Sequence, residues 1–280
     1  MVRLQDLRDA PPWTWPEGTG KALLAVLRDL HAPAADLTLA AELAGDYTVI
    51  DDDLAHELLA ILRSGDRPAE LRARAAISLG PVLEDADAHE PGDFDDVPIT
   101  ESTFRAIQAS LRDLFRSAAV PGEVRRRILE ASVRAEADWH RDAVRAAYAD
   151  DDETWRLTAV FCMRFVGGFD AQILEALGSE NADIRCEAVL AAGAQEVDAA
   201  WPQLAAIVTA ETADKPLLLA AIEAVASIRP HEAVGILDEI DDSEDEDVAA
   251  AVEEAIAMAA AMTGQGEAED DDDDDDDDDP

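Results

Sequence analysis

The 280-residue sequence is poor in cysteine, aromatic residues and lysine. Its two cysteines, Cys162 and Cys186, fall within expected helices and not at the paired short spacing of a zinc or redox site, so we expect both to pack as small core residues. No stretch of about 18 apolar residues is free of charge, and the charged N-terminus lacks the apolar run of a signal peptide. We therefore expect a soluble, cytoplasmic protein that binds no membrane.

Negative charge dominates the composition. The formal net charge is -42, and the lysines are Lys21 and Lys215. Part of the acid lies in the run Asp270 to Asp279, but residues 1–266 remain strongly acidic without it. Such a surface suits a high-salt cytoplasm, where concentrated ions screen self-repulsion, and the hypothesis is a halophilic or salt-tolerant source. An acidic body also repels a polyanion, so no nucleic-acid partner is expected.

Several stretches resemble functional motifs but lack a required residue. "PEGTGKALL" resembles a phosphate-binding loop, yet Trp15 occupies the place of the first glycine and Ala22 that of the hydroxyl residue. Two His-Glu pairs begin a zinc-protease pattern, but Ala60 and Gly235 stand where the second histidine is needed. The acidic runs lack the central glycine of a calcium loop and suit helix caps. We expect no catalytic residue, metal or cofactor.

An internal repeat of about 31 residues runs through the chain. Apolar or small residues recur at the first, fifth and ninth places of each copy, which is helical spacing with one buried stripe. A second helix is expected between successive copies, and two-helix units with one apolar stripe must stack to bury it. The copies are LRARAAISLG (from Leu71), VRRRILEASV (Val124), WRLTAVFCMR (Trp155), IRCEAVLAAG (Ile184), LLLAAIEAVA (Leu217) and VAAAVEEAIA (Val248).

The stretches "DIRCEAVLAAG" and "ELRARAAISLG" resemble the HEAT repeat of the short bacterial type, which is also found in phycobilisome-lyase-like proteins. The resemblance covers residues 30–262. It implies an all-α fold, a right-handed α-solenoid of stacked two-helix HEAT-like repeats over residues 1–263. Arginine stands at the second place of four copies, whereas Leu218 and Ala249 replace it in the last two, so we expect any ladder of Arg–acid pairs between repeats to fade toward the C-terminal end.

Two segments depart from the repeat. Residues 85–103 are rich in Pro, Gly and Asp and predict an irregular acidic insertion, either a solvated excursion or a binding element. Residues 264–280 are low-complexity acid that buries too little apolar surface to fold, so a disordered poly-Asp tail is expected there.

The family resemblance implies that the motif helix lines the concave surface of the array. If the first, fifth and ninth places are buried, the third and seventh face outward, and the candidate protein-binding residues are an apolar patch rimmed by charge: Leu157, Phe161 and Leu190 with Arg126 and Glu130. The same rule selects Cys186, Leu219 and Glu223. The alternative is that tight curvature buries these side chains between neighbouring units.

Arginine is concentrated in the middle of the chain. Eleven of the 20 arginines lie between Arg105 and Arg164. They either pair with acids on neighbouring helix faces or form a docking patch for an acidic partner or for the chain's own tail, because guanidinium groups bind carboxylates in a bidentate manner.

The sequence therefore predicts a non-enzymatic adaptor or scaffold that binds another protein through the concave face. The alternative is a lyase-like repeat enzyme or enzyme subunit that acts on a small ligand or a modified protein. A pocket with converging polar groups would favour the enzyme.

Overall fold

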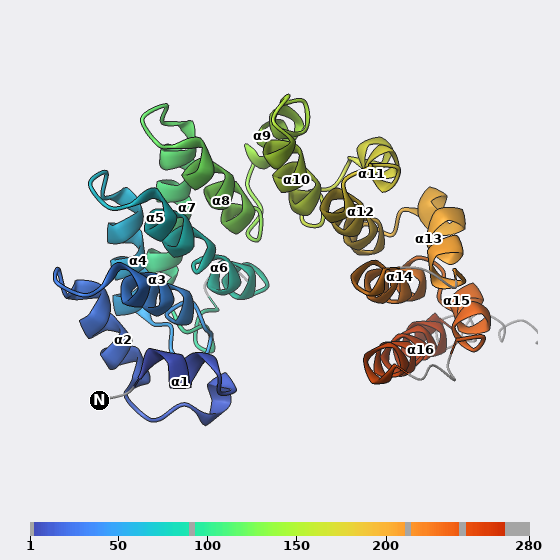
Figure 1. Ribbon diagram of the computed structural model, residues 1–280, viewed down its shortest axis with the longest axis horizontal. Helices are drawn as coiled ribbons and strands as arrows, with labels where there is room; N and C mark the ends of the chain where they lie inside the picture. The colour runs from blue at the N-terminus through green and yellow to red at the C-terminus, as the bar shows by residue number, and fades with distance from the viewer. Residues whose placement is uncertain (1–2, 90–92, 211–213, 241–244, 267–280) are drawn as a thin grey trace, which may run out of the picture. The chain divides into compact units, whose positions relative to one another are not determined.

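The computed structural model describes residues 3–89, 93–210, 214–240 and 245–266. Within these ranges the regular elements are all helices, and no strand is present (Figure 1). The predicted all-α class is confirmed. No helix in the described ranges combines the length and apolar character needed to cross a bilayer.

The chain divides into two compact units, Met1–Ala143 and Val144–Pro280. The extent of a single array over residues 1–263 stays a prediction. The first unit contains α1 (Leu4–Arg8), η1 (Pro12–Thr14), α2 (Thr19–Arg28), α3 (Ala34–Leu43), α4 (Asp52–Arg63), α5 (Ala69–Ile77), α6 (Gly80–Asp87), α7 (Glu101–Arg116) and α8 (Gly122–Ser132).

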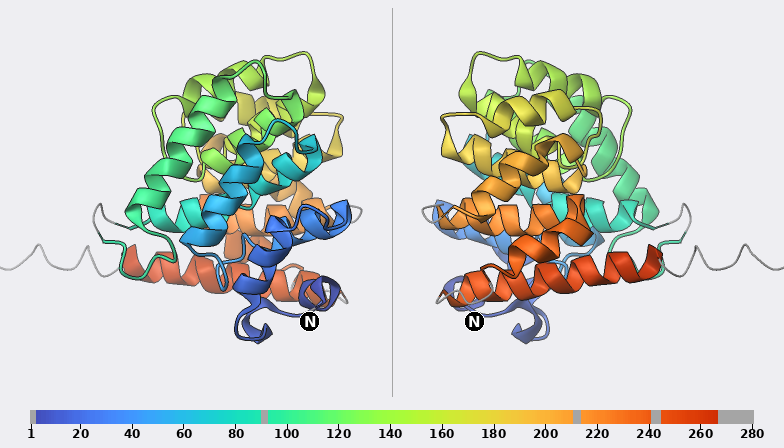
Figure 2. Two further views of the ribbon diagram at one scale, coloured as in Figure 1. Left: turned by 90° about the vertical axis from the view of Figure 1, so that its left-hand side faces the viewer. Right: turned by 90° about the vertical axis from the view of Figure 1, so that its right-hand side faces the viewer.

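Helix α9 (His140–Tyr148) spans the division between the units. The second unit continues with α10 (Glu153–Cys162), α11 (Asp170–Leu177), α12 (Ala182–Ala194), η2 (Asp198–Ala200), α13 (Trp201–Val208), α14 (Lys215–Ile228), α15 (Pro230–Leu237) and α16 (Glu246–Gly266). Helix α16 is the long terminal helix in Figure 2 and extends beyond residue 263, the predicted end of the array. The predicted disordered tail lies outside the described residues from 267 onward.

The predicted repeat is the organising feature of both units. Each motif segment forms one helix of a pair, and these helices pack on one another along each unit: α3 on α5 and α5 on α8 in the first, α10, α12, α14 and α16 in turn in the second. The places expected to be buried are buried, as at Ile184, Ala188 and Ala192 of α12, each exposing at most 1% of its surface. Stacking therefore supplies the apolar cover that no single repeat has.

Close approach of neighbouring motif helices depends on small side chains. A Cβ atom placed on Gly193 of α12 would lie 2.9 Å from both Cα and Cβ of Ala224 on α14. Heavy atoms of this kind do not approach so closely without displacing the backbone. Gly193 and Ala224 thus set the spacing between two successive repeats of the second unit.

The acidic runs at helix starts act as caps, as predicted. The Asp51 side chain accepts a hydrogen bond from the Leu54 N–H at 2.9 Å, and the Asp152 side chain accepts one from the Thr154 N–H at 2.9 Å. Each cap satisfies a backbone donor that the first turn of a helix leaves open.

The insertion is packed and shorter than predicted. Helix α6 continues to Asp87 and α7 begins at Glu101, and the described part of the connection buries Val97 and Ile99. The backbone N–H of Thr100 donates to Asp52 at 2.9 Å. Burial raises the pKa of Asp52, but hydrogen bonds from Thr100 and Thr103 outweigh it and hold that pKa below its ordinary value. The expectation of a purely irregular excursion over 85–103 was therefore wrong at both ends.

The ladder of ion pairs does not fade toward the C-terminal end. Successive repeats are linked by Arg74–Glu42 (3.6 Å) in the first unit and Arg229–Asp198 (2.7 Å) in the second, and Lys215 near the end contacts Asp245 at 2.7 Å. The repeat arginine has another role: Arg72 is buried, and its Nε donates to the carbonyl of Leu62 at 2.9 Å. The carbonyl belongs to the last turn of α4 in the same repeat, where unpaired carbonyls and the helix dipole favour a cation.

The Arg185 guanidinium repeats this arrangement in the second unit. Its Nη1 donates to the carbonyls of Ser179 at 2.7 Å and Glu180 at 3.0 Å, in the turn that follows α11. The prediction that these arginines form the ladder was wrong because their nearest acceptors are the carbonyls at the end of the preceding helix.

Replacing Gly193 by alanine should lower the free energy of unfolding by about 1–3 kcal/mol, since the added methyl group forces α12 and α14 apart. Gly235→Ala on α15 is the matched control, because its Cβ would meet no atom within 4 Å and helix propensity adds up to about 1 kcal/mol. Urea unfolding of both variants measures the difference, and equal stabilities would contradict this account of the helix spacing.

The Arg72→Met variant should lose about 1–3 kcal/mol of stability, because the substitution leaves the Leu62 carbonyl without its donor. The Arg74→Met variant, which removes an exposed pair with Glu42, should change stability by no more than about 1 kcal/mol. Thermal and urea unfolding distinguish the two, and the idea fails if Arg74→Met is the more damaging change.

Candidate functional site

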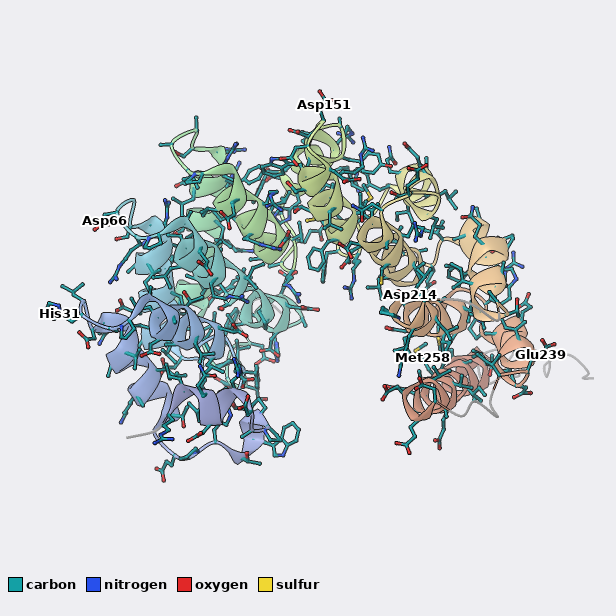
Figure 3. The ribbon with its side chains drawn as sticks, viewed as in Figure 1. His31, Asp66, Asp151, Asp214, Glu239 and Met258 are labelled. Carbon is teal, nitrogen blue, oxygen red and sulfur yellow. The ribbon has the colours of Figure 1, made fainter. Side chains whose placement is uncertain are left out.

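The main groove of the second unit lies across three consecutive motif helices, α12, α14 and α16, and has a volume of about 590 Å³. Its apolar part includes Leu190 of α12, Leu219 of α14 and Met258 of α16. Met258 is labelled in Figure 3, where it lies between the ribbons of α16 and α14. Alanines of α14 and α16 complete the lining, and their small side chains leave the space between the helices open.

Carboxylates line the same groove. Glu223 of α14 and Glu254 of α16 are both exposed, and neither carboxylate has an ion pair or hydrogen bond with a residue in the described part of the chain. Asp247 also contributes, but it is paired with Lys215 at 2.6 Å, and Lys215 is further engaged by Asp245. The uncompensated charge of the groove is therefore negative.

A thiol lies at the α12 side of the groove. Cys186 is partly buried, and its Sγ lies 4.0 Å from the carbonyl of Pro216. Burial, together with the negative charges of Glu187 and Asp183, raises the pKa of the Cys186 thiol. The thiol thus stays protonated at neutral pH, which makes it a poor nucleophile.

The rule that the third and seventh places face outward succeeds on α12 and α14. It selects Cys186 and Leu190 on the first and Leu219 and Glu223 on the second, and all four line the groove. The groove residues of α16 were missed. Applied to the segment from Val248, the same rule selects Ala250 and Glu254, which also line the groove, so the signal was available in the sequence.

The five residues proposed for protein binding do not share one site. Leu190 lies in the groove, whereas Leu157 and Phe161 are half-buried on α10 and do not line it. Phe161 packs against Phe165 with ring centroids 5.6 Å apart, and the Arg164 guanidinium lies 5.7 Å from its ring.

The other two proposed residues lie on α8 of the first unit. Arg126 is half-buried, but Glu130 is 6% exposed and forms an ion pair with Arg127. The prediction that Glu130 rims an exposed patch was wrong, because α8 packs against α5, α6 and α7 and buries more than one stripe of its surface.

One buried titratable side chain lies outside the groove. His140 is 2% exposed, both ring nitrogens lack a hydrogen-bond partner, and its ring lies 4.3 Å from that of Trp139 between centroids. Burial lowers the pKa of His140 to about 4, against a small opposing effect of Asp138. His140 is therefore neutral in the folded protein at pH 7.

His140 should make the folded state sensitive to acid. Because its folded pKa lies below the ordinary value of 6.5, the unfolded state binds the extra proton, and stability is lost as the pH falls from about 6.5 to about 4. Between pH 7 and pH 5 the wild type should lose about 2 kcal/mol relative to His140→Phe. Urea unfolding of both proteins across this range measures the difference, and parallel pH curves would contradict it.

The described residues contain no group of three or more His, Cys, Asp or Glu side chains placed to hold a metal ion. Comparisons with other proteins bear mainly on the fold. No protein-family model and no curated protein matches the chain.

Three solved structures are similar to it. Human deoxyhypusine hydroxylase in complex with glycerol shares 20% identity over 92% of this chain and 88% of its own, with a TM-score of 0.41. The Escherichia coli protein YibA shares 14% identity over 91% and 85%, with a TM-score of 0.47. An engineered protein shares 16% identity over 93% and 98%, with a TM-score of 0.32.

These likenesses support a helical-repeat fold and assign no substrate. They also correct an inference drawn from the sequence, that the chain is a non-enzymatic adaptor or scaffold. Human deoxyhypusine hydroxylase is an enzyme among the structures that resemble this chain. A helical-repeat fold therefore gives no ground for excluding enzymatic activity, and the adaptor prediction was wrong to rest on it.

Proposed function

We propose that the groove of α12, α14 and α16 is the ligand site of an enzyme or enzyme subunit that acts on a small amine with an apolar body. The observation that carries the proposal is the combination of an apolar lining with two carboxylates, Glu223 and Glu254, that have no partner in the described chain. A ligand that brings an ammonium group and a hydrocarbon body satisfies both features at once.

Hydrocarbon burial supplies the affinity in this proposal, and charge supplies the selectivity. Each methylene group removed from water contributes roughly 0.8 kcal/mol, whereas an ion pair at a solvent-exposed rim contributes at most about 1 kcal/mol. The strongly negative chain also attracts cations and repels anions at a distance. An alkylamine is thus favoured over an alcohol of the same length, and a fatty acid is disfavoured.

The proposal gives Cys186 a contact role. A protonated thiol is a weak nucleophile, so the Glu223 and Glu254 carboxylates are the groups assigned to hold and orient the ammonium group. We also include in this proposal a cytoplasmic location, a short bacterial HEAT-repeat type for the fold, and a high-salt environment that suits the acidic, lysine-poor surface.

Octylamine should slow the alkylation of Cys186 by iodoacetamide several-fold, because the bound ligand covers the thiol at the edge of the groove. Octanol should protect less and octanoate least. Cys162 is fully buried, so peptide mapping by mass spectrometry can follow Cys186 alone. Equal protection by all three compounds, or by none, would contradict an amine site.

Removing the two groove carboxylates tests the selectivity. Glu223→Gln with Glu254→Gln should weaken octylamine binding by about threefold to tenfold and leave octanol binding unchanged. Glu232→Gln with Glu253→Gln is the control, since it removes the same charge at exposed positions outside the groove. Mass spectrometry of the amine recovered after incubation with each protein tests the enzymatic part of the proposal.

A further inference from the structure

The segment around α7 and α8 is basic in a protein that is otherwise acidic. Residues 104–135 contain seven arginines and three acids, while the whole chain has a net charge of -42. The two helices pack against each other and are joined by the short turn 117–121. The last turn of α7 and the first turns of α8 therefore meet at one end of a helical hairpin.

Ion pairing uses only some of these arginines. Arg105 pairs with Glu101, Arg127 with Glu130, and Arg134 with Glu84. In contrast, no residue in the described chain forms an ion pair with the three arginines that define what we call the Arg surface: Arg112, Arg116 and Arg126.

The geometry of the Arg surface favours an extended anion. Arg112 and Arg116 are one helical turn apart and lie on the same face of α7, and Arg126 is in the second turn of α8. The Nε atom of Arg112 is buried and has no hydrogen-bond partner. Guanidinium groups in this arrangement offer several planar forks, each of which matches a carboxylate.

We propose that the Arg surface is a docking site for the acidic segment 267–280 of the chain. The segment carries 12 carboxylates, Glu267, Glu269 and Asp270 to Asp279, and follows directly on α16, which ends at Gly266. Fourteen residues reach up to about 45 Å when extended. Charge complementarity selects this occupant, because the groove of the second unit has an acidic rim and repels the same segment.

This docking has a consequence for other ligands. A segment held mainly by charge dissociates readily in salt, and any other anion that binds the Arg surface must compete with it. The tail then restricts the Arg surface to partners more anionic, or better shaped, than itself. The inference is independent of the amine site, since the two surfaces share no residue.

A fluorescein-labelled peptide with the sequence of residues 267–280 tests the inference in fluorescence anisotropy titrations with the full-length chain. The peptide should bind about tenfold tighter to a full-length variant in which Asp270 to Asp279 are all replaced by Asn, because that variant has lost its own competing tail. Binding should weaken strongly between low and physiological salt. Equal affinity for the wild type and the Asn variant overturns the proposal.

Substitutions locate the site. In the Asn-tail background, Arg112→Gln, Arg116→Gln and Arg126→Gln together should weaken peptide binding about fivefold or more. The charge-matched control is Arg3→Gln, Arg8→Gln and Arg67→Gln, which should leave affinity nearly unchanged. Circular dichroism verifies folding of each variant, and an equal loss in both sets would show that overall charge, and not the Arg surface, holds the peptide.

Discussion

The close packing of successive motif helices is the interaction on which the rest of the structure depends. No two-helix unit can cover its own apolar stripe, so each must lie against the next, and the distance between them is set by the smallest side chains at the contact. At Gly193 and Ala224 the backbones approach until a methyl group no longer fits. This constraint explains why the motif copies differ in their outward residues but keep small or apolar ones at the first, fifth and ninth places.

The groove follows from the same constraint. When three helices stack in parallel rows, their third and seventh places line one surface, whatever residues stand there. In the second unit those places hold leucine and alanine beside glutamate and a thiol, and they come from segments about 30 residues apart in the chain. Stacking determines where a ligand can bind, and the outward residues determine its chemistry.

The sequence was sufficient for the repeat, the buried stripe and four of the groove residues, because these depend on helical periodicity alone. It was insufficient where an element outside the repeat changes the packing. Glu130 stands at an outward place but belongs to α8, which also contacts the extra helix α6. Likewise, the pattern of Arg72 and Arg185 predicts a cation at a fixed place but not its partner, and the carbonyls at the end of the preceding helix are nearer than any acid of the next repeat.

Charge is distributed unevenly because the two ends of each repeat have different requirements. Acids at helix starts satisfy open N–H groups and face the positive end of the helix dipole, so they accumulate without needing cationic partners. Arginines that contact helix ends are held by carbonyls and so do not neutralise acids either. A chain built in this way keeps a large net negative charge while leaving a few arginines, such as Arg116 and Arg126, without a carboxylate nearby. In such a field an unpaired arginine is the exception, which is why an anionic segment selects the Arg surface and a cationic ligand selects the groove.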